Sequence, residues 1–393
     1  AASGASLYLG SYASGDNYMD MSAITPSTMQ LNRLKWETTT EYNTGLDASF
    51  LKGKLRFTVD VYQKYIKDLL QKKVKMPTSI GYGNGYEVSY MNSGKMTNKG
   101  WEFRVDAVPF ENRDWRVGFY FNIAHNENKI TEMPDNYTEE NYTFNNGEYA
   151  YRREEGRPMG SFYGYRYKGV CQNKDATYAR DADGNVMKDI SGNAIVMRNG
   201  TATIAPGDAL YEDINHDGVI NQYDIVYLGN SNPRFTGGAG VNVSYKQFKL
   251  SAIFYGRYGQ DVVNSTRLNN ESMRGIDNQS TAVLRRWRNE GDQTDIPRAL
   301  YGEGYNTLGS DRFVEDASYL RLKSLSFNYR LPKKIIQRWG FSNIDVYVTG
   351  YNLFTWTKYT GQDPEVKTEN TYARDSATTP ASIQLVAGFN LSF

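Results

Sequence analysis

The chain has 393 residues, and its 45 basic and 44 acidic side chains nearly cancel, which argues against a nucleic acid or another polyanion as partner. Hydrophobic residues make up 39% of the chain, too many for a disordered protein. The single cysteine, Cys171, excludes an intrachain disulfide and a thiolate metal cluster. No apolar run is long enough for a transmembrane helix. The 32 tyrosines suit strands and membrane interfaces alike.

Alternation of apolar and polar residues predicts long strands along the chain. We expect them at 41–50, 54–66, 100–108, 115–125, 235–246, 248–258, 319–331, 343–354 and 381–393. In the strand at 319–331, Arg321 and Lys323 share a face with apolar residues. We therefore expect these two charges near a rim, where long side chains can reach water.

The connections between the expected strands differ in length. Those at 51–53, 109–114, 246–247 and 332–342 are short, whereas those at 67–99, 126–234, 259–318 and 355–380 are long and polar. If successive strands alternate in direction, all short connections fall on one side and all long ones on the other. Outer-membrane barrels have short periplasmic turns and long extracellular loops.

These patterns predict an all-β fold, a transmembrane antiparallel β-barrel with long extracellular loops. We expect 126–234 to form an extracellular subdomain, with Ser161–Val170 as a strand. Trp339, Trp356 and Tyr359 are expected near the two membrane interfaces. A soluble sandwich, jelly roll or propeller remains an alternative, because alternation alone does not exclude it.

The odd number of expected strands does not suit a closed bacterial barrel, which has an even number. Unpaired strand edges are not viable in lipid. Either a tenth strand lies in the first 35 residues, or further strands lie upstream of the given sequence. We therefore expect this chain to need more strands to complete a barrel.

No catalytic set is found in the sequence. The only histidines, His125 and His216, lack the serine or cysteine neighbourhood of a nucleophilic triad. The sequence therefore predicts a protein that is not an enzyme.

The segment 213–224 has the residue spacing of a calcium-binding loop. Side-chain oxygens fall at Asp213, Asn215, Asp217 and Asp224, and Val219 occupies the position that contributes a backbone carbonyl. The glycine at loop position 6, Gly218, permits the sharp turn. Asp224 is shorter than the usual glutamate, and no helices are expected on either side. The alternative is a turn held by Asx and glycine conformations.

Three stretches together resemble a known family. They are Leu34–Leu70, which contains Leu-Lys-Trp-Glu and Asp-Val-Tyr; Gly207–Phe235, which contains Asp-Ile-Asn-His-Asp-Gly; and Tyr319–Glu365, which contains Tyr-Leu-Arg-Leu-Lys-Ser-Leu and Tyr-Asn-Leu-Phe-Thr. In order and spacing they are similar to the C-terminal barrel portion of the SusC/RagA family of TonB-dependent outer-membrane transporters from Bacteroidetes. The resemblance covers about Leu34 to Phe393.

The resemblance implies a 22-stranded barrel with a plug domain, located in the bacterial outer membrane. It implies import of oligosaccharides or oligopeptides, with energy from the TonB complex and a SusD-like surface lipoprotein as lid. Under this interpretation residues 1–393 are part of one barrel domain. The plug and the rest of the barrel are expected outside this chain. A surface-exposed β-rich binding or structural protein that does not transport is the alternative.

Overall fold

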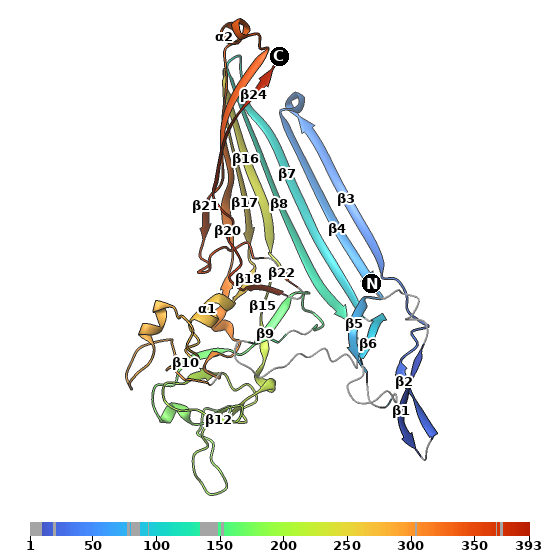
Figure 1. Ribbon diagram of the computed structural model, residues 1–393, viewed down its shortest axis with the longest axis vertical. Coiled ribbons are helices and arrows are strands. Elements are labelled where there is room, and N and C mark those ends of the chain that lie inside the picture. Colours follow the sequence, from blue (N-terminus) through green and yellow to red (C-terminus); the bar gives the residue numbers. More distant parts are fainter. Residues whose placement is uncertain are drawn as a thin grey trace.

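The computed structural model describes residues 10–18, 21–76, 79, 87–92, 94–133, 148–150, 153–302, 305–366, 368–369 and 372–393. Its dominant feature is a tall antiparallel sheet, with smaller folded segments gathered at one end (Figure 1). The described part of the sheet has nine strands, which follow one another in the same order as along the chain. Among the described residues, no helix has both the length and the apolar character needed to cross a membrane.

All nine expected strands are confirmed. They are β3 (Thr38–Phe50), β4 (Leu55–Lys67), β7 (Lys95–Glu111), β8 (Trp115–Glu132), β16 (Phe235–Tyr245), β17 (Phe248–Tyr258), β20 (Tyr319–Arg330), β21 (Asn343–Thr357) and β24 (Gln384–Ser392). Strands β7 and β8 extend beyond the expected ends, because they keep pairing past His125, for example Asn98 with Asn128. Backbone pairing needs no apolar alternation, so the sequence pattern could not reveal this extension.

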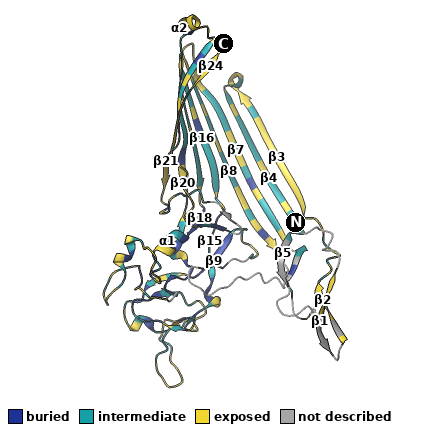
Figure 2. Ribbon diagram, in the orientation of Figure 1, coloured by how far each residue is buried: buried dark blue, intermediate teal, exposed yellow. Residues whose placement is uncertain are grey.

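The register between neighbouring strands places apolar residues opposite apolar residues and polar residues opposite polar or small ones. Val241 pairs with Phe119 on one side and Ala252 on the other, and the next row joins Asn242 to Gly118 and Ser251. Since side chains alternate between faces, the sheet has one apolar face and one polar face. In Figure 2 the strands of the sheet are mostly intermediate or exposed, and the buried segments gather beyond one of its ends.

Connection lengths also follow the prediction. At the end nearest the C-terminus, called here the turn end, strands are joined by η2 (Leu51–Gly53) and by residues 112–114, 246–247 and 331–342, the last with α2 (Lys333–Ile336) and η9 (Gln337–Trp339). The described residues of the long connections 68–94, 133–234, 259–318 and 358–383 lie at the opposite end, called the loop end. The expected boundary at 126 is thus corrected to 133.

The sheet does not close on itself within the described residues. Strand β3 pairs only with β4, and β24 pairs only with β21. Near the N-terminus, β1 (Ser11–Tyr18) and β2 (Met21–Thr28) form a separate two-stranded sheet, as do β5 (Leu70–Lys75) and β6 (Glu87–Asn92). The described residues of the first 35 therefore do not supply the tenth strand.

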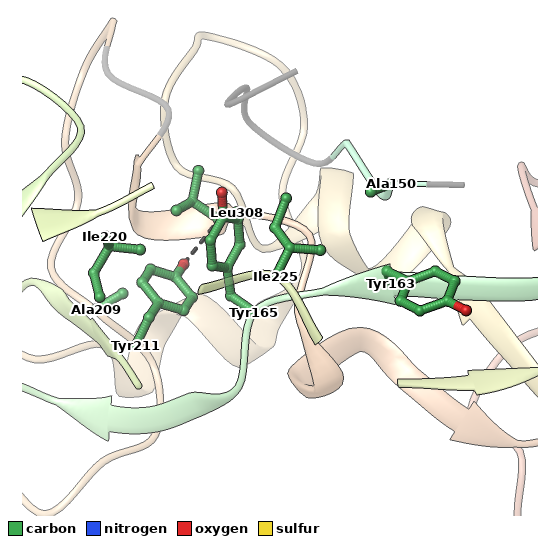
Figure 3. Packing of buried hydrophobic residues seen from close by; sticks show 8 residues of the cluster. All are labelled: Ala150, Tyr163, Tyr165, Ala209, Tyr211, Ile220, Ile225 and Leu308. Carbon is green, nitrogen blue, oxygen red and sulfur yellow. Dashed lines mark hydrogen bonds between the residues drawn. The ribbon is translucent and has the colours of Figure 1, made fainter. Parts of the chain in front are cut away.

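The described residues between 148 and 234 form a subdomain at the loop end. Its short strands are β9 (Ser161–Gly164), β10 (Tyr167–Val170), β11 (Arg198–Asn199), β12 (Ala202–Thr203), β13 (Ala209–Tyr211), β14 (Val219–Ile220) and β15 (Val226–Asn230). Its core contains Tyr165, Tyr211 and Ile220 (Figure 3). Leu308, from the connection 259–318, completes this core, and its backbone N–H donates to the Tyr211 hydroxyl at 3.0 Å.

The single strand expected at Ser161–Val170 is wrong in detail, because two strands occur there. Strand β9 pairs with β15, whereas β10 pairs with β13. Between β9 and β10, Tyr165 forms an isolated parallel β-bridge with Ser310. The approach is close: a Cβ added at Gly164 would lie 2.3 Å from the Gly309 carbonyl oxygen. A long-range contact of this kind leaves no periodic signal in the sequence.

The connections 259–318 and 358–383 share a further sheet. It consists of β18 (Asp261–Asn264), β19 (Val314–Asp316), β22 (Thr368–Glu369) and β23 (Tyr372–Asp375), with α1 (Ser265–Asn270) beside it. Tyr359 is buried here, and its hydroxyl donates to Asp375 at 2.6 Å. Tyr359 is therefore covered by protein rather than presented to lipid, and its level relative to the membrane stays a prediction. The loop end is one packed assembly rather than a set of separate loops.

Candidate functional site: the polar face and the loop end

The polar face of the sheet carries charged side chains well inside the strands. Asp60 and Glu102 are directly opposite each other on β4 and β7, and Arg104 donates to Asp106 at 2.7 Å. A hollow of about 340 Å³ lies on this face and is lined by Thr58, Asp60, Glu102, Arg104, Asn122 and Tyr255, among others. Carboxylate, guanidinium, amide and phenol groups side by side can bind polar ligands through hydrogen bonds to both donors and acceptors.

A β-bulge brings Arg321 onto this polar face. Along β20, Ser324 pairs with Ile253 of β17 and Leu322 pairs with the next residue, Phe254, so Lys323 is an extra residue. A bulge of this kind reverses the alternation beyond it. Arg321 therefore does not share a face with Leu325, and the expectation that it reaches water at a rim is wrong: its side chain is 2% exposed.

Arg321 is buried against the last connection of the chain, 358–383. Its guanidinium donates to Asp363 at 2.5 Å and to Glu365 at 2.9 Å, and its Nε donates to the Thr355 hydroxyl at 2.9 Å. Lys323 adds a second bond to Glu365 at 2.9 Å. Although burial opposes it, donation by two backbone N–H groups and Arg321 holds the pKa of Asp363 below its ordinary value. The pairs therefore anchor this connection to the sheet.

A second ionic cluster joins the connections 259–318 and 358–383. Arg312 and Glu271 are 4% and 6% exposed and lie 2.8 Å apart. Arg267 bridges Glu271 at 3.0 Å and Glu315 at 3.2 Å, and Glu315 accepts from the Thr360 hydroxyl. Removing one charged side chain from such a buried cluster leaves the charge of its partner uncompensated. The loop end is therefore held together by ionic contacts as well as by its apolar core.

The predicted calcium residues come together in one loop, mostly engaged with backbone groups. Asp213 accepts from the Gly218 N–H at 2.8 Å, and Asp217 accepts from the Val219 N–H at 2.7 Å. The side-chain amide of Asn215 donates to Asp217, and the Val219 carbonyl accepts from the Asn221 amide at 3.1 Å. These are the bonds of an Asx-stabilised turn.

Asp224 closes the same loop from inside the subdomain. It is fully buried, and its two oxygens accept from the N–H groups of Ile214 and Asn221, each at 2.8 Å. Burial raises the pKa of Asp224 despite these bonds. In the described part of the chain, no three His, Cys, Asp or Glu side chains are grouped as metal ligands. As arranged, these side chains form a turn that is held by bonds to the backbone.

The two histidines bond to main-chain carbonyls. His125 lies 2.6 Å from the Arg234 oxygen, and His216 lies 3.2 Å from the Arg180 oxygen. His216 has a positive φ of 55°, as expected for a tight turn. Neither arrangement contains a nucleophile that the imidazole could activate.

Aromatic side chains form two belts on the apolar face. At the loop end, Phe235 lies 6.1 Å from Trp101 and 6.4 Å from Tyr258. At the turn end, the Trp115 and Tyr245 rings are 4.3 Å apart. Trp356 and Trp339 lie toward the loop end and the turn end respectively, and their position at the membrane interfaces stays a prediction.

The spacing of the belts matches a membrane. Phe235 and Tyr245 are the first and last residues of the 11-residue strand β16. Ten steps of about 3.3 Å span roughly 33 Å. A tilt of about 40° reduces this length to about 25 Å, which is the height of the apolar band in outer-membrane barrels.

Sequence reasoning missed the partners of Arg321. The stretch Gln362–Glu365 was noticed only as part of a family motif, and its two carboxylates were not matched to a cation. A usable signal was present, because the alternation of β20 fails at Lys323 alone. A charge on an otherwise apolar face is better explained by a bulge than by a rim.

Comparison with known proteins identifies similar chains. The model of a family described as TonB dependent receptor-like, beta-barrel, matches residues 2–353. TonB-dependent receptor P3 of Formosa agariphila is 32% identical over 349 residues, or 86% of this chain and 32% of that receptor. The TonB-dependent receptor SusC of Bacteroides thetaiotaomicron is 27% identical over 97% of this chain and 34% of that protein. The chain thus spans about a third of the length of these curated relatives.

Solved structures agree with the sequence comparison. A structure of the RagAB peptide transporter matches with a TM-score of 0.70 and 26% identity, and the match covers 98% of this chain and 39% of that one. A RagAB peptide importer in an open-open state matches with a TM-score of 0.71 and 25% identity. The sheet and the loop-end assembly are therefore arranged as in these chains.

Replacing Arg321 should release the connection 358–383. In Arg321→Met the carboxylates of Asp363 and Glu365 lose their main partner. Removing one partner of a buried ion pair lowers the free energy of unfolding by about 3–5 kcal/mol, and we expect a value near the lower limit because both carboxylates are partly exposed. Arg330→Met is the matched control. Arg330 lies on the same strand as Arg321 and pairs with Asp345 of β21, but its side chain is 63% exposed, so we expect the free energy of unfolding to fall by at most about 1 kcal/mol.

Thermal unfolding and limited proteolysis of the full receptor in detergent measure both effects. The depressed pKa of Asp363 sets the sign of the pH dependence. The contribution of Asp363 to the free energy of unfolding is fully present above its ordinary pKa of 3.8 and is lost as the pH falls through its lowered pKa. Equal stability of the two variants at neutral pH would contradict the anchoring role.

Proposed function

Because the chain belongs to the TonB-dependent receptor-like β-barrel family, we propose that it forms part of the transport barrel of an outer-membrane importer for bulky nutrients. Members of this family are outer-membrane proteins and not enzymes. The observation that carries the proposal is the two-faced sheet. Its apolar face between aromatic belts suits lipid, and its polar face, with a charged hollow, suits a lumen.

We propose oligopeptides or oligosaccharides as the cargo. The structural neighbours are described as peptide transporters, whereas SusC is described only as a TonB-dependent receptor. The polar face offers carboxylates and guanidinium groups, which suit peptide termini, and phenol rings such as Tyr255, which suit sugars and peptides alike. We propose that energy from the TonB complex reaches the cargo through a plug domain.

A SusD-like surface lipoprotein is the proposed partner at the loop end. Several large apolar side chains are exposed there, among them Ile190, Tyr223, Ile276, Leu284 and Tyr301. Exposed apolar groups on an otherwise polar surface are typical of contact sites. We propose that the subdomain formed by the described residues between 148 and 234 is extracellular and forms part of this contact. The free edges of β3 and β24 would pair with the rest of the barrel.

Uptake by cells that express the full receptor tests the proposed function. We expect labelled oligopeptides or oligosaccharides to enter, and entry to stop when the proton-motive force is dissipated. Tyr255→Ala, in the polar hollow, should weaken cargo binding several-fold, about 1 kcal/mol for one aromatic contact. Tyr329→Ala on the apolar face is the matched control. Recovery in the soluble fraction without detergent would instead favour a surface-exposed binding protein.

Arginine scanning tests which face meets lipid. Val241 lies in the middle of β16 on the apolar face, and Asn242 follows it on the polar face. Val241→Arg should cost about 2–4 kcal/mol, the range for a cation at the bilayer midplane. Asn242→Arg should cost much less, because the lumen holds water. Heat-modifiable migration on gels and urea unfolding in vesicles measure both, and a larger cost for Asn242→Arg would reverse the assigned faces.

We propose calcium at the loop 213–224 as a structural ligand that rearranges the turn. The support is the ligand spacing of Asp213, Asn215, Asp217, Val219 and Asp224. Calcium should then protect the subdomain from proteolysis, and Asp217→Ala should abolish that protection. Asp181→Ala, in the neighbouring Asx turn, is the control. Protection that is independent of calcium would leave the loop as a turn without metal.

A further inference from the structure

Arg257 is a cation on the polar face that has no ionic partner. It lies in β17 on the same face as Tyr255, and its Nε donates to the Tyr255 hydroxyl at 3.2 Å. Among the described residues, no carboxylate lies within ion-pair distance of Arg257. The side chain is half-buried, so water hydrates its charge only in part. A guanidinium in this state favours an anionic ligand.

The charges around Arg257 do not cancel it. Arg321 and Lys323 lie on the neighbouring strand β20. These two cations already share both carboxylates of the connection 358–383 that reach this face, Asp363 and Glu365. The group therefore contains three cations and two anions, and Arg257 is the cation that remains without a carboxylate.

The Tyr319 hydroxyl is a second unused group beside Arg257. Tyr319 and Arg257 are directly paired across β20 and β17. Tyr319 is 5% exposed, and its hydroxyl has no hydrogen-bond partner among the described residues. A buried hydroxyl without a partner is costly, because it has lost its bonds to water and gained none in return. An acceptor that reached this hydroxyl would remove the cost.

A row of small residues connects Arg257 to the polar hollow, the hollow of about 340 Å³ described above. This row crosses the strands on the polar face from Glu102 through Ala124 and Thr236 to Arg257. Ala124 and Thr236 line the hollow. Three steps of about 4.8 Å between strands separate Glu102 from Arg257 by roughly 14 Å. Part of a bulky cargo therefore fits between these two side chains.

The far side of the polar hollow repels anions. Glu102 lies directly opposite Asp60, and neither carboxylate forms an ion pair with a described residue. Arg104, a cation that lines the hollow, is bound through two N–H groups to Asp106. A negative group on the cargo is therefore repelled at the Glu102 side and attracted at the Arg257 side.

A second hollow lies on the apolar face of the same strands. Its volume is about 670 Å³, and its lining includes Phe121, Ile123, Leu320 and part of Arg257. The register places the Arg257 side chain on the polar face, and the bond to Tyr255 agrees with this. An anionic ligand of Arg257 would therefore arrive from the polar side.

We propose that Arg257 and Tyr319 form a subsite for a carboxylate group of the cargo. This inference rests on the proposed function, since it takes the polar face as the wall of the transport lumen. Because Tyr255 holds Nε, the two Nη groups bind the carboxylate end-on. A small shift of the Arg257 side chain toward the cargo lets the Tyr319 hydroxyl donate to the same carboxylate. The rest of the cargo lies over Ala124 and Thr236.

A peptide C-terminus and an acidic sugar both supply a carboxylate, and matched probes distinguish them. The first pair is N-acetyl-tetraalanine and its C-terminal amide, and the second is tetragalacturonate and its methyl ester. Isothermal titration calorimetry with the full receptor in detergent gives the ratio of affinities within each pair. We expect the acid to bind about tenfold or more tightly than the neutral form in at least one pair, as for hydrogen bonds to a charged group. The pair that shows the preference identifies the source of the carboxylate.

Variants assign the preference to the two residues. Arg257→Met should reduce the ratio to near unity. Arg330→Met is the matched control and should keep the ratio, since Arg330 lies on the same face at the turn end and pairs with Asp345. Tyr319→Phe should lower the ratio about threefold without lowering the Tm, because the removed hydroxyl has no partner among the described residues. A purely structural hydroxyl would lower the Tm and leave the ratio unchanged.

Three results would overturn the subsite. They are equal affinity for the acid and the neutral form in both pairs, failure of both acids to bind at millimolar concentration, and an unchanged ratio in Arg257→Met. The transport function fails separately. It is contradicted if cells that express the receptor take up neither form of a probe that the purified receptor binds.

Discussion

Backbone hydrogen bonding is the constraint on which the rest of this structure depends. In lipid an unpaired N–H or C=O group has no water to replace its partner, so every membrane-spanning strand needs a neighbour on each side. A sheet of consecutive antiparallel strands meets this demand with short turns at one end. The same pairing fixes the register, and the register keeps each face uniform over strands that are distant in sequence.

The bulge at Lys323 is a local exception that connects the sheet to the loops. Without the extra residue, Arg321 would point from the apolar face, and burying its charge there would be costly. With it, the guanidinium lies on the polar face and binds Asp363 and Glu365. One irregular residue thus gives the connection 358–383 a fixed attachment. Bulges are frequent next to functional sites because they redirect a side chain.

The sheet could be predicted from the sequence, whereas the loop end could not. Period-two alternation is a local property, and it identified all nine strands and both kinds of connection. The core around Tyr211 and Leu308 joins residues 97 positions apart, and no local pattern carries that information. The loop 213–224 could be predicted from the sequence only in part. Its residues do come together, but the sequence did not reveal that Asp224 would be buried and bonded to backbone groups.

The two hollows are separated by little more than one layer of backbone. Asn122, Ile123, Thr236 and Gly237 border both of them, and Gly237 has no side chain to thicken the wall. A molecule bound on either face therefore contacts the same stretch of β8 and β16. At Gly237 the wall between the two hollows is thus one backbone layer thick.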